Sequence, residues 1–475
     1  MYSTKKTIIL LLSTVATSGL GVSAGAATWR VTPTLTATET YTDNVNLDET
    51  VRQGDFVTQI SPQVQLTGTG ARLNASILYG ANYFFYPGST GGEKHDLRHT
   101  VQANLNSELV NDLFFIDAGA NVDQQFLDRR QAISSVDVSQ TKNRRTVQSY
   151  RFSPYLAHRF GSWATTQLRY ELRHVRSSSD TEQTTLNTFF GNSLTHRGTF
   201  SLSNGPAFQR LGWTLSAVYA NEEREDQADF DTRTLNADLS YQLLDQFALL
   251  GSIGYQDRDG GNSFANFDGV TWDAGFRFVP GPRTSISMRY GNRSGTDTFS
   301  LNAQYKMTAK HSINLTYTDT IQTFQSFAFD EIPGPVIDPT QSGNFVSGDI
   351  TRRKQARLYL TGSRGRTSYS MSGSYSRNKS DNSALDEDRY SAAVSLNRQL
   401  SRRLSLGSSF SYNLSKFASD GTEDTFWSAS VNGNYSISQS LVGTLGYTHS
   451  DRDQARFANL NGGTNYISLS IRATF

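Results

Sequence analysis

The sequence predicts an all-β protein, a transmembrane outer-membrane β-barrel of antiparallel, up-and-down type with about 22 strands (range roughly 18–24). Alternating apolar and polar segments of about 10–14 residues run from Trp29 to Phe475, and the breaks between them alternate between short and long. Strands of soluble proteins cluster near 5–6 residues, whereas a tilted strand needs about 9–11 residues to cross a bilayer. Segment length therefore favours a membrane barrel over a soluble sandwich or propeller.

The composition agrees with a wall that has only one apolar face. The chain has 475 residues, of which 36% are hydrophobic and 12% aromatic, with 38 glycines and a mean hydropathy of −0.48. Only the N-terminus holds a long apolar run, which excludes a polytopic helical membrane protein. The absence of cysteine excludes a disulfide scaffold, thiolate metal sites and a cysteine nucleophile.

Residues 1–27 have the features of a secretory signal peptide. Lys5 and Lys6 precede an apolar stretch over Thr7–Val22, and Ala24-Gly25-Ala26 is a small-residue cleavage site. The alternative is a single membrane anchor, but the apolar stretch is short and ends in small residues. We therefore expect a signal peptide over 1–27 and one barrel domain over 28–475.

Apolar residues recur at every second position of these segments, which predicts β-strands. One example is the alternation of apolar Leu235, Ala237, Leu239, Tyr241 and Leu243 with polar neighbours, which places each set on one face of a strand. Short breaks such as Leu244–Gln246 alternate with long polar ones such as Arg176–Gly191, as in outer-membrane barrels with short periplasmic turns. An even strand number places both mature termini in the periplasm of a Gram-negative cell.

The last segment alternates to the end of the chain. Its apolar positions are Ile467, Leu469, Ile471, Ala473 and the terminal Phe475. A soluble protein would leave such an edge strand open to aggregation. We interpret Phe475 as part of the signal that the outer-membrane assembly machinery recognises.

Splitting each strand into two faces gives candidate lumen-lining residues. Where Leu168, Tyr170 and Leu172 face lipid, the residues left inside are charged, and the same holds beside Ile286, Met288 and Tyr290. The candidates are Arg169, Glu171, Arg173, Arg289 and Arg293. A charge on the lipid face would cost roughly 2–4 kcal/mol at the midplane. Two interpretations remain: a selectivity lining for an acidic or polar permeant, or cross-strand ion pairs that hold a hydrated wall together. The mixture of signs favours ion pairs.

The longest break, Thr320–Ile350, is a candidate lid. It contains Pro333, Pro335 and Pro339, which stiffen the loop and lower its ordering cost. The strand pattern starts at Trp29, directly after the signal, so we expect no plug domain. An open lumen of this width would leak, so we expect loops or a partner to restrict it. The alternatives are a mobile surface loop and a lid or infolded constriction.

No motif of an enzyme stands out. The seven histidines show no spacing that defines a site, and the acidic stretch around Asp386 lacks Ca²⁺-loop spacing. We expect no catalytic residues, no metal and no cofactor. The 44 Lys and Arg nearly balance the 43 Asp and Glu, so the net charge gives no reason to expect nucleic acid as a partner.

The segment Thr38-Glu39-Thr40-Tyr41-Thr42-Asp43-Asn44-Val45-Asn46-Leu47 carries a resemblance. It resembles the opening of the PEP-CTERM system-associated outer membrane proteins, which are similar to the β-barrel porin 2 group and are associated with exopolysaccharide loci. The resemblance implies a part in moving or anchoring surface polymer, and it transfers no catalytic residue. By itself, Asp43-Asn44 suits a tight turn.

These observations predict a barrel that forms a restricted, water-filled passage linked to exopolysaccharide export. The alternatives are a general diffusion porin and a structural or adhesive barrel that binds surface glycan through its long loops. The expected partners are outer-membrane lipid, the outer-membrane assembly machinery, and exopolysaccharide or its export proteins.

Overall fold

The computed structural model describes residues 27–89, 93–126, 130–141, 143–178, 192–225, 228–260, 266–293, 295–323, 350–380 and 386–475. Residues 1–26 of the predicted signal peptide and residues 324–349 of the candidate lid lie outside these residues. The ends of the predicted lid, Thr320–Thr323 and Ile350, are described and belong to strands rather than to a loop. Among the described residues, no helix is long and apolar enough to cross a membrane.

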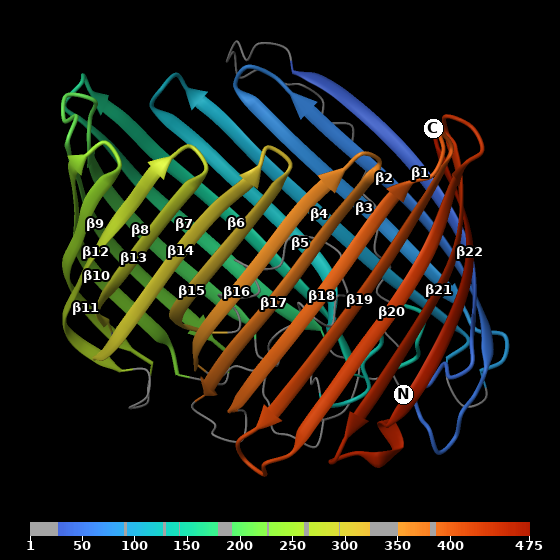
Figure 1. The fold of residues 1–475 in the computed structure, drawn as a ribbon. Helices are drawn as coiled ribbons and strands as arrows, with labels where there is room; N and C mark the ends of the chain where they lie inside the picture. Colours follow the sequence, from blue (N-terminus) through green and yellow to red (C-terminus); the bar gives the residue numbers. More distant parts are fainter. Residues whose placement is uncertain are drawn as a thin grey trace, which may run out of the picture.

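The described chain folds into one closed sheet of 22 antiparallel strands (Figure 1). The strands are β1 (Thr28–Thr42), β2 (Asp55–Thr69), β3 (Leu73–Phe85), β4 (His95–Val110), β5 (Phe114–Phe126), β6 (Arg144–Phe160), β7 (Ala164–Ser178), β8 (Ser193–Asn204), β9 (Leu211–Arg224), β10 (Phe230–Leu244), β11 (Phe247–Asp259), β12 (Phe267–Gly281), β13 (Thr284–Arg293), β14 (Thr296–Thr308), β15 (His311–Thr323), β16 (Ile350–Arg364), β17 (Thr367–Ser380), β18 (Glu387–Gln399), β19 (Leu404–Phe417), β20 (Glu423–Ser436), β21 (Leu441–Gln454) and β22 (Gly462–Thr474), with a short 3₁₀ turn at Ala458–Leu460. The predicted fold class and strand number are confirmed.

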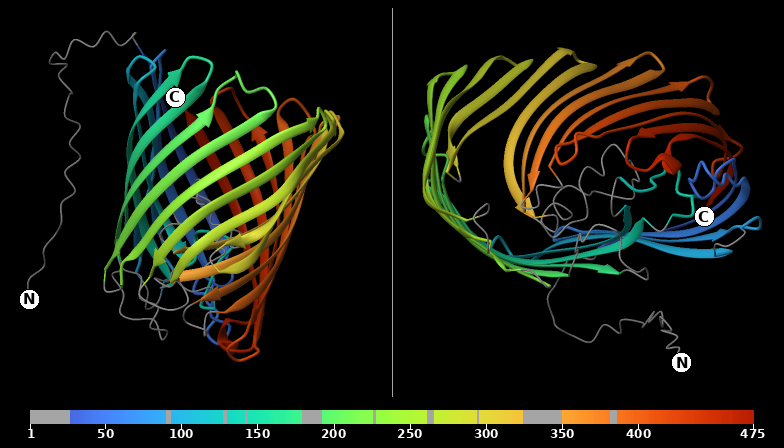
Figure 2. Two further views of the ribbon diagram at one scale, coloured as in Figure 1. Left: turned by 90° about the vertical axis from the view of Figure 1, so that its left-hand side faces the viewer. Right: turned by 90° about the horizontal axis from the view of Figure 1, so that it is seen from below.

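Closure is made by the first and last strands. Thr34 pairs with Thr474 and Thr42 pairs with Tyr466, so β1 and β22 run antiparallel along this seam. Each other strand pairs with its neighbours in sequence, which is the up-and-down order that the sequence predicts. Figure 2 shows the tilted strands arranged as a ring. The start of β1 and the end of β22 lie at the same end of the barrel.

The two ends of the barrel differ in their connections. At the end that holds the start of β1, all connections are short, such as 245–246, 309–310 and 365–366; we call it the short-turn end. The other end, the long-loop end, carries connections such as 43–54, 127–143 and 324–349. One connection there departs from the expectation, because Arg293 of β13 pairs directly with Thr296 of β14.

Three prolines, Pro33, Pro62 and Pro154, lie within early strands without ending them. Pro33 lies in β1 opposite Val64, and the pairing of β1 with β22 starts one residue later. Pro62 and Pro154 lie where pairing with one neighbour lapses. A proline lacks the N–H that the ladder needs, so each occupies a position where one ladder is already open.

The two faces of the wall carry opposite chemistry. Along β10, Leu235, Leu239 and Tyr241 are about half exposed, whereas polar residues alternate with them on the other face. This exposed apolar set repeats around the ring and forms a surface suited to lipid. We call the opposite face the inner face.

Candidate functional site

The inner face carries charged side chains held in pairs. Arg169 of β7 donates to Asp117 of β5 (Nη1–Oδ2, 2.8 Å) and to the Ser153 hydroxyl of β6 (2.8 Å). Its guanidinium lies 3.9 Å from the centroid of the Tyr155 ring. One arginine therefore connects three neighbouring strands. Glu171 and Arg173, further along β7, form their own pair (Nε–Oε1, 2.5 Å), and both side chains are largely buried.

A second network centres on Asp273 of β12, whose side chain is only 3% exposed. Its carboxylate accepts hydrogen bonds from Arg289 (2.7 Å) and Arg293 (2.6 Å) of β13 and from the Ser252 hydroxyl (2.7 Å) of β11. Arg289 also lies 3.6 Å from Asp238 of β10. The five candidate residues from the sequence thus all form ion pairs in the structure, in three separate groups.

Another feature of the inner face comes from the β5–β6 connection. Its described residues 130–141, which we call the inner segment, fold back within the ring of strands, as the view along the barrel shows (Figure 2, right). Val138 of this segment is 2% exposed and packs in a buried cluster with Val45, Val57, Phe84, Tyr86 and Tyr466. Burying each apolar side chain contributes about 1.5–3 kcal/mol, so this cluster holds the segment against the wall.

Asp137 is the main polar anchor of the inner segment. Its carboxylate lies 2.6 Å from Arg98 Nη1 of β4 and also pairs with Arg144 at the start of β6. Arg98 in turn pairs with Asp96 (2.7 Å), and its Nη2 lies 3.4 Å from the Tyr86 hydroxyl. Burial raises the pKa of Tyr86 to about 12 although the nearby Arg98 opposes this, so the phenol stays neutral.

Two serines form the second anchor. Ser134 Oγ and Ser139 Oγ each lie 3.1 Å from the hydroxyl of Tyr466 on β22, and they are 3.0 Å from each other. All three side chains are buried. A third anchor is Arg452 of β21, which donates to the carbonyl oxygen of Gln131 and pairs with Asp424 (2.5 Å). The inner segment is therefore fixed to β4, β6, β21 and β22.

The decapeptide at the end of β1 meets the inner segment directly. The N–H of Gln140 donates to the carbonyl oxygen of Val45 (2.9 Å). Asp43 accepts hydrogen bonds from the backbone N–H (2.9 Å) and Nδ2 (2.7 Å) of Asn465 on β22, and it pairs with Arg52 (3.0 Å). Partial burial opposes ionisation, but these hydrogen bonds and the charge of Arg52 lower the pKa of Asp43. The turn expected at Asp43-Asn44 thus also fastens the seam.

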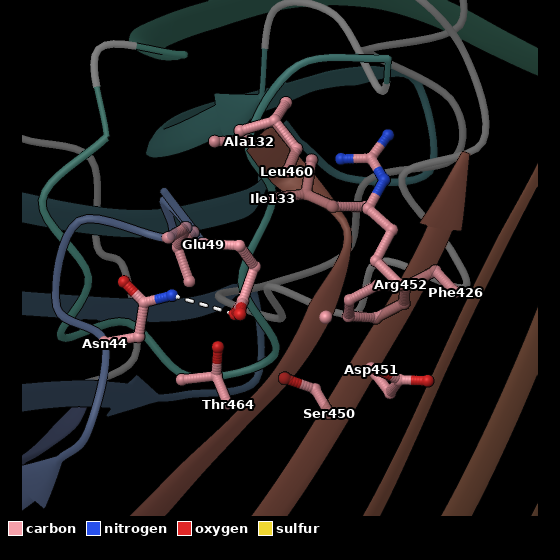
Figure 3. Close-up of a pocket in the computed structure, with 12 residues that line it drawn as sticks. Asn44, Glu49, Ala132, Ile133, Phe426, Ser450, Asp451, Arg452, Leu460 and Thr464 are labelled. Atoms are coloured by element: carbon pink, nitrogen blue, oxygen red, sulfur yellow. Dashed lines mark hydrogen bonds between the residues drawn. The ribbon is translucent and has the colours of Figure 1, made fainter. Parts of the chain in front are cut away.

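A small pocket lies where these elements meet (Figure 3). Asn44, Glu49 and Ile133 line it together with Ser450 and Arg452, and Asn44 Nδ2 lies 3.3 Å from Glu49 Oε1. Its volume of about 20 Å³ has room for about one water molecule. This pocket is too small for a sugar.

The remaining candidates from the sequence are Phe475 and the three prolines of the candidate lid. Phe475 is 75% exposed, and its N–H donates to the carbonyl oxygen of Pro33 (3.0 Å). Pro333, Pro335 and Pro339 of the candidate lid lie outside the described residues. Among the residues that the structure describes, no group of three or more His, Asp and Glu side chains could hold a metal ion.

The sequence pattern does not distinguish the inner segment from the other long polar connections. A signal was present, because Ile133, Val136 and Val138 are apolar residues within a polar connection. Their partners, such as Tyr466, lie more than 300 residues away in the chain. No local pattern could reveal that contact.

No family model and no curated protein matches the chain. Several solved structures do match, at low sequence identity. The FrpB iron transporter from Neisseria meningitidis (F5-1 variant) has a TM-score of 0.53 and 11% identity, with 93% of this chain and 82% of that chain covered. The siderophore receptor PirA from Acinetobacter baumannii has a TM-score of 0.51 and 9% identity, with 93% of this chain and 80% of that chain covered. The ferric-catecholate import receptor Fiu from E. coli K12 has a TM-score of 0.51 and 10% identity, with 93% of this chain and 81% of that chain covered. The chain therefore has the fold of Gram-negative outer-membrane β-barrels.

Proposed function

We propose that the protein forms a restricted, water-filled passage across the outer membrane and that this passage serves exopolysaccharide export. The observation that carries the passage is the inner segment, fixed to the inner face by Asp137 and by the Ser134–Ser139–Tyr466 cluster. A barrel of 22 strands encloses a lumen wide enough to leak, so a fixed internal segment is what a controlled passage requires.

The polar inner wall supports the same proposal. Charges on it are paired across strands, as at Arg169–Asp117 and Arg289–Asp273, so the wall is hydrated without a strong field of one sign. Such a wall accepts a polar solute without holding it tightly. In this proposal the five candidate residues line the lumen and act first as structural ion pairs.

The link to exopolysaccharide rests on the decapeptide Thr38–Leu47 and its resemblance to barrels associated with PEP-CTERM and exopolysaccharide loci. The short-turn end, with both barrel termini, faces the periplasm in this proposal, and the long loops face outward. The signal peptide over residues 1–27 and assembly through Phe475 belong to the same proposal, as do polymer or its export proteins as partners.

The test combines a deletion strain with purified protein in planar bilayers. The proposal expects loss of surface polymer with accumulation in the periplasm, together with a small, steady conductance. Normal polymer with steady conductance would instead indicate a general diffusion porin. Loss of attached but not of secreted polymer, without conductance, would indicate a structural or adhesive barrel.

A further inference from the structure

The short-turn end of the barrel carries a large excess of basic residues. In its turns and the three adjoining residues of each strand, all of them described, Arg and Lys number thirteen and Asp and Glu number three. The three acids are Glu108, Asp112 and Asp245. The whole chain has a formal net charge of only +1, so the rest of the chain carries the compensating acidic excess. We call the thirteen basic residues the basic rim: Arg30, Arg72, Arg159, Arg210, Arg283, Lys306, Lys310, Arg364, Arg366, Arg398, Arg402, Arg403 and Arg472.

The turns themselves form one part of the basic rim. From β12 to β19, each turn at this end carries a cation: Arg283, Lys310, Arg366, Arg402 and Arg403. All five are exposed. Successive turns are two strands apart, about 10 Å, which is close to the Debye length of about 8 Å at physiological salt. The fields of neighbouring cations therefore overlap.

Strand ends form a second part. Arg30, Arg159, Lys306 and Arg472 are exposed and alternate with outward residues such as Val31, Tyr305 and Ile471, so they lie on the inner face at the mouth. Only Arg364 and Arg398 of the rim share the lipid-facing side with Leu358 and Leu396. Most of the positive charge thus faces the mouth and the water around it.

The basic rim differs from the inner wall in one decisive respect. The arginines of the wall, such as Arg169 and Arg289, are neutralised by carboxylates within 3 Å. None of the thirteen rim residues forms a salt bridge with a residue that the structure describes. Unneutralised cations at a mouth raise the local concentration of anions and guide them inward.

We propose that the basic rim is a loading site for an acidic polysaccharide, which enters the lumen from the short-turn end. This inference rests on the proposed passage and specifies its substrate class as a glycan that carries carboxylates. A polyanion gains from the rim because binding releases counterions along its whole length. An anionic lipid surface fits less well, because few of the cations face the lipid.

Tyr359 supports a glycan over other polyanions. It lies on β16 on the side opposite Leu358, and its side chain is 45% exposed on the inner face. The residues paired with it, Asn314 and Ser372, are small and polar. An exposed tyrosine offers an apolar ring face and a polar tip, the combination that a sugar ring contacts well.

The test measures current block by defined polymers in planar bilayers. The probes are an alginate oligomer (a polyuronate) and a neutral dextran of the same length. We expect the alginate oligomer to block at a lower concentration from the short-turn side than from the long-loop side, and the dextran to leave the current unchanged. The chain has no cysteine, so a Ser438→Cys variant labelled with biotin identifies the short-turn side when streptavidin is added.

The matched variants change three charges each. In the rim variant, Arg366→Glu, Arg402→Glu and Arg403→Glu weaken alginate block on the order of tenfold or more. In the control, Lys94→Glu, Arg176→Glu and Lys379→Glu make the same change at exposed positions of the long-loop end and leave the block unchanged. Raised salt weakens the block of the wild-type protein and has less effect on the rim variant.

Several results would overturn the loading site: equal block from both sides, block by dextran, or an unchanged rim variant. Capture of the purified barrel on alginate-coated beads provides a readout that needs no current. Preference for anionic phospholipid vesicles or for polyaspartate over alginate in that assay would assign the rim to lipid or to an acidic protein. If the barrel conducts no current in the absence of polymer, the proposed passage is refuted. The bead assay would still test whether the basic rim binds the acidic polysaccharide.

Discussion

Asp137 of the inner segment lies 2.6 Å from Arg98 of β4, and this contact joins a connection between two strands to the inner wall. The Arg98 side chain is only 6% exposed, so its charge depends on Asp137 and Asp96 for compensation. Removing one partner of a buried ion pair leaves an uncompensated charge, which is costly. The position of the inner segment is therefore sensitive to this one contact.

The first prediction concerns this anchor. Asp137→Asn should weaken the docking of the inner segment by about 2–3 kcal/mol, because it removes a charged acceptor from Arg98 and Arg144. Limited proteolysis of purified barrel should then cut within 130–141 faster than in the wild-type protein. Asp388→Asn is the control, since it removes an ion pair with Arg377 on the lipid-facing side. Equal cleavage rates in both variants would contradict the anchor.

A second prediction concerns ion selectivity. Asp273→Asn removes the carboxylate shared by Arg289 and Arg293 and leaves both arginines with excess positive charge on the inner face. Reversal potentials across a salt gradient should shift toward anion selectivity, and the free energy of unfolding should fall by about 2–3 kcal/mol. The same substitution at Asp388 should leave the reversal potential unchanged. An unaltered potential in Asp273→Asn would place this network outside the ion path.

The third prediction is a pH dependence at the seam. Hydrogen bonds from Asn465 and the charge of Arg52 lower the pKa of Asp43 despite partial burial, so the folded barrel favours its ionised form. A lowered pKa stabilises the fold fully above the unfolded value of about 3.9, and the contribution is lost as pH falls below it. Asp43→Asn should therefore lower the melting temperature at pH 7 and have a smaller effect near pH 3. An equal difference at both pH values would contradict the assignment.

The fourth prediction concerns assembly. Phe475 is exposed, and its backbone N–H donates to the carbonyl oxygen of Pro33. Phe475→Ala should reduce the amount of barrel in the outer membrane of cells, yet protein refolded in detergent should melt at the wild-type temperature. Leu400→Ala, an exposed residue at the same end, is the control for loss of apolar surface. A parallel loss of thermal stability would make Phe475 a structural residue instead.

The sequence predicts the wall well because the alternation of apolar and polar residues within each strand indicates which face meets lipid. The alternation at Leu235–Leu243 and Ile467–Ala473 needs no distant partner, and the structure has strands there. The inner segment could not be found in the same way, because Ser134 and Ser139 depend on Tyr466 at the far end of the chain. The basic rim can be found from the sequence, but the net charge of the whole chain hides it, because acidic residues elsewhere offset Arg366 and Arg402. A separate count of charges for each end of the barrel reveals the basic excess.

In the proposed function, the inner segment restricts a water-filled passage. The most direct test compares single-channel conductance of the wild-type barrel with a variant in which residues 131–140 are replaced by a short Gly-Ser linker. A second variant lacking Phe329–Gln341 tests the proline-rich candidate lid in the same bilayers, and a larger conductance there would assign restriction to that loop as well. We predict a small conductance for the wild-type barrel and a severalfold larger one without the inner segment. Identical conductance in the wild-type barrel and the linker variant, or no current in either, would contradict the account.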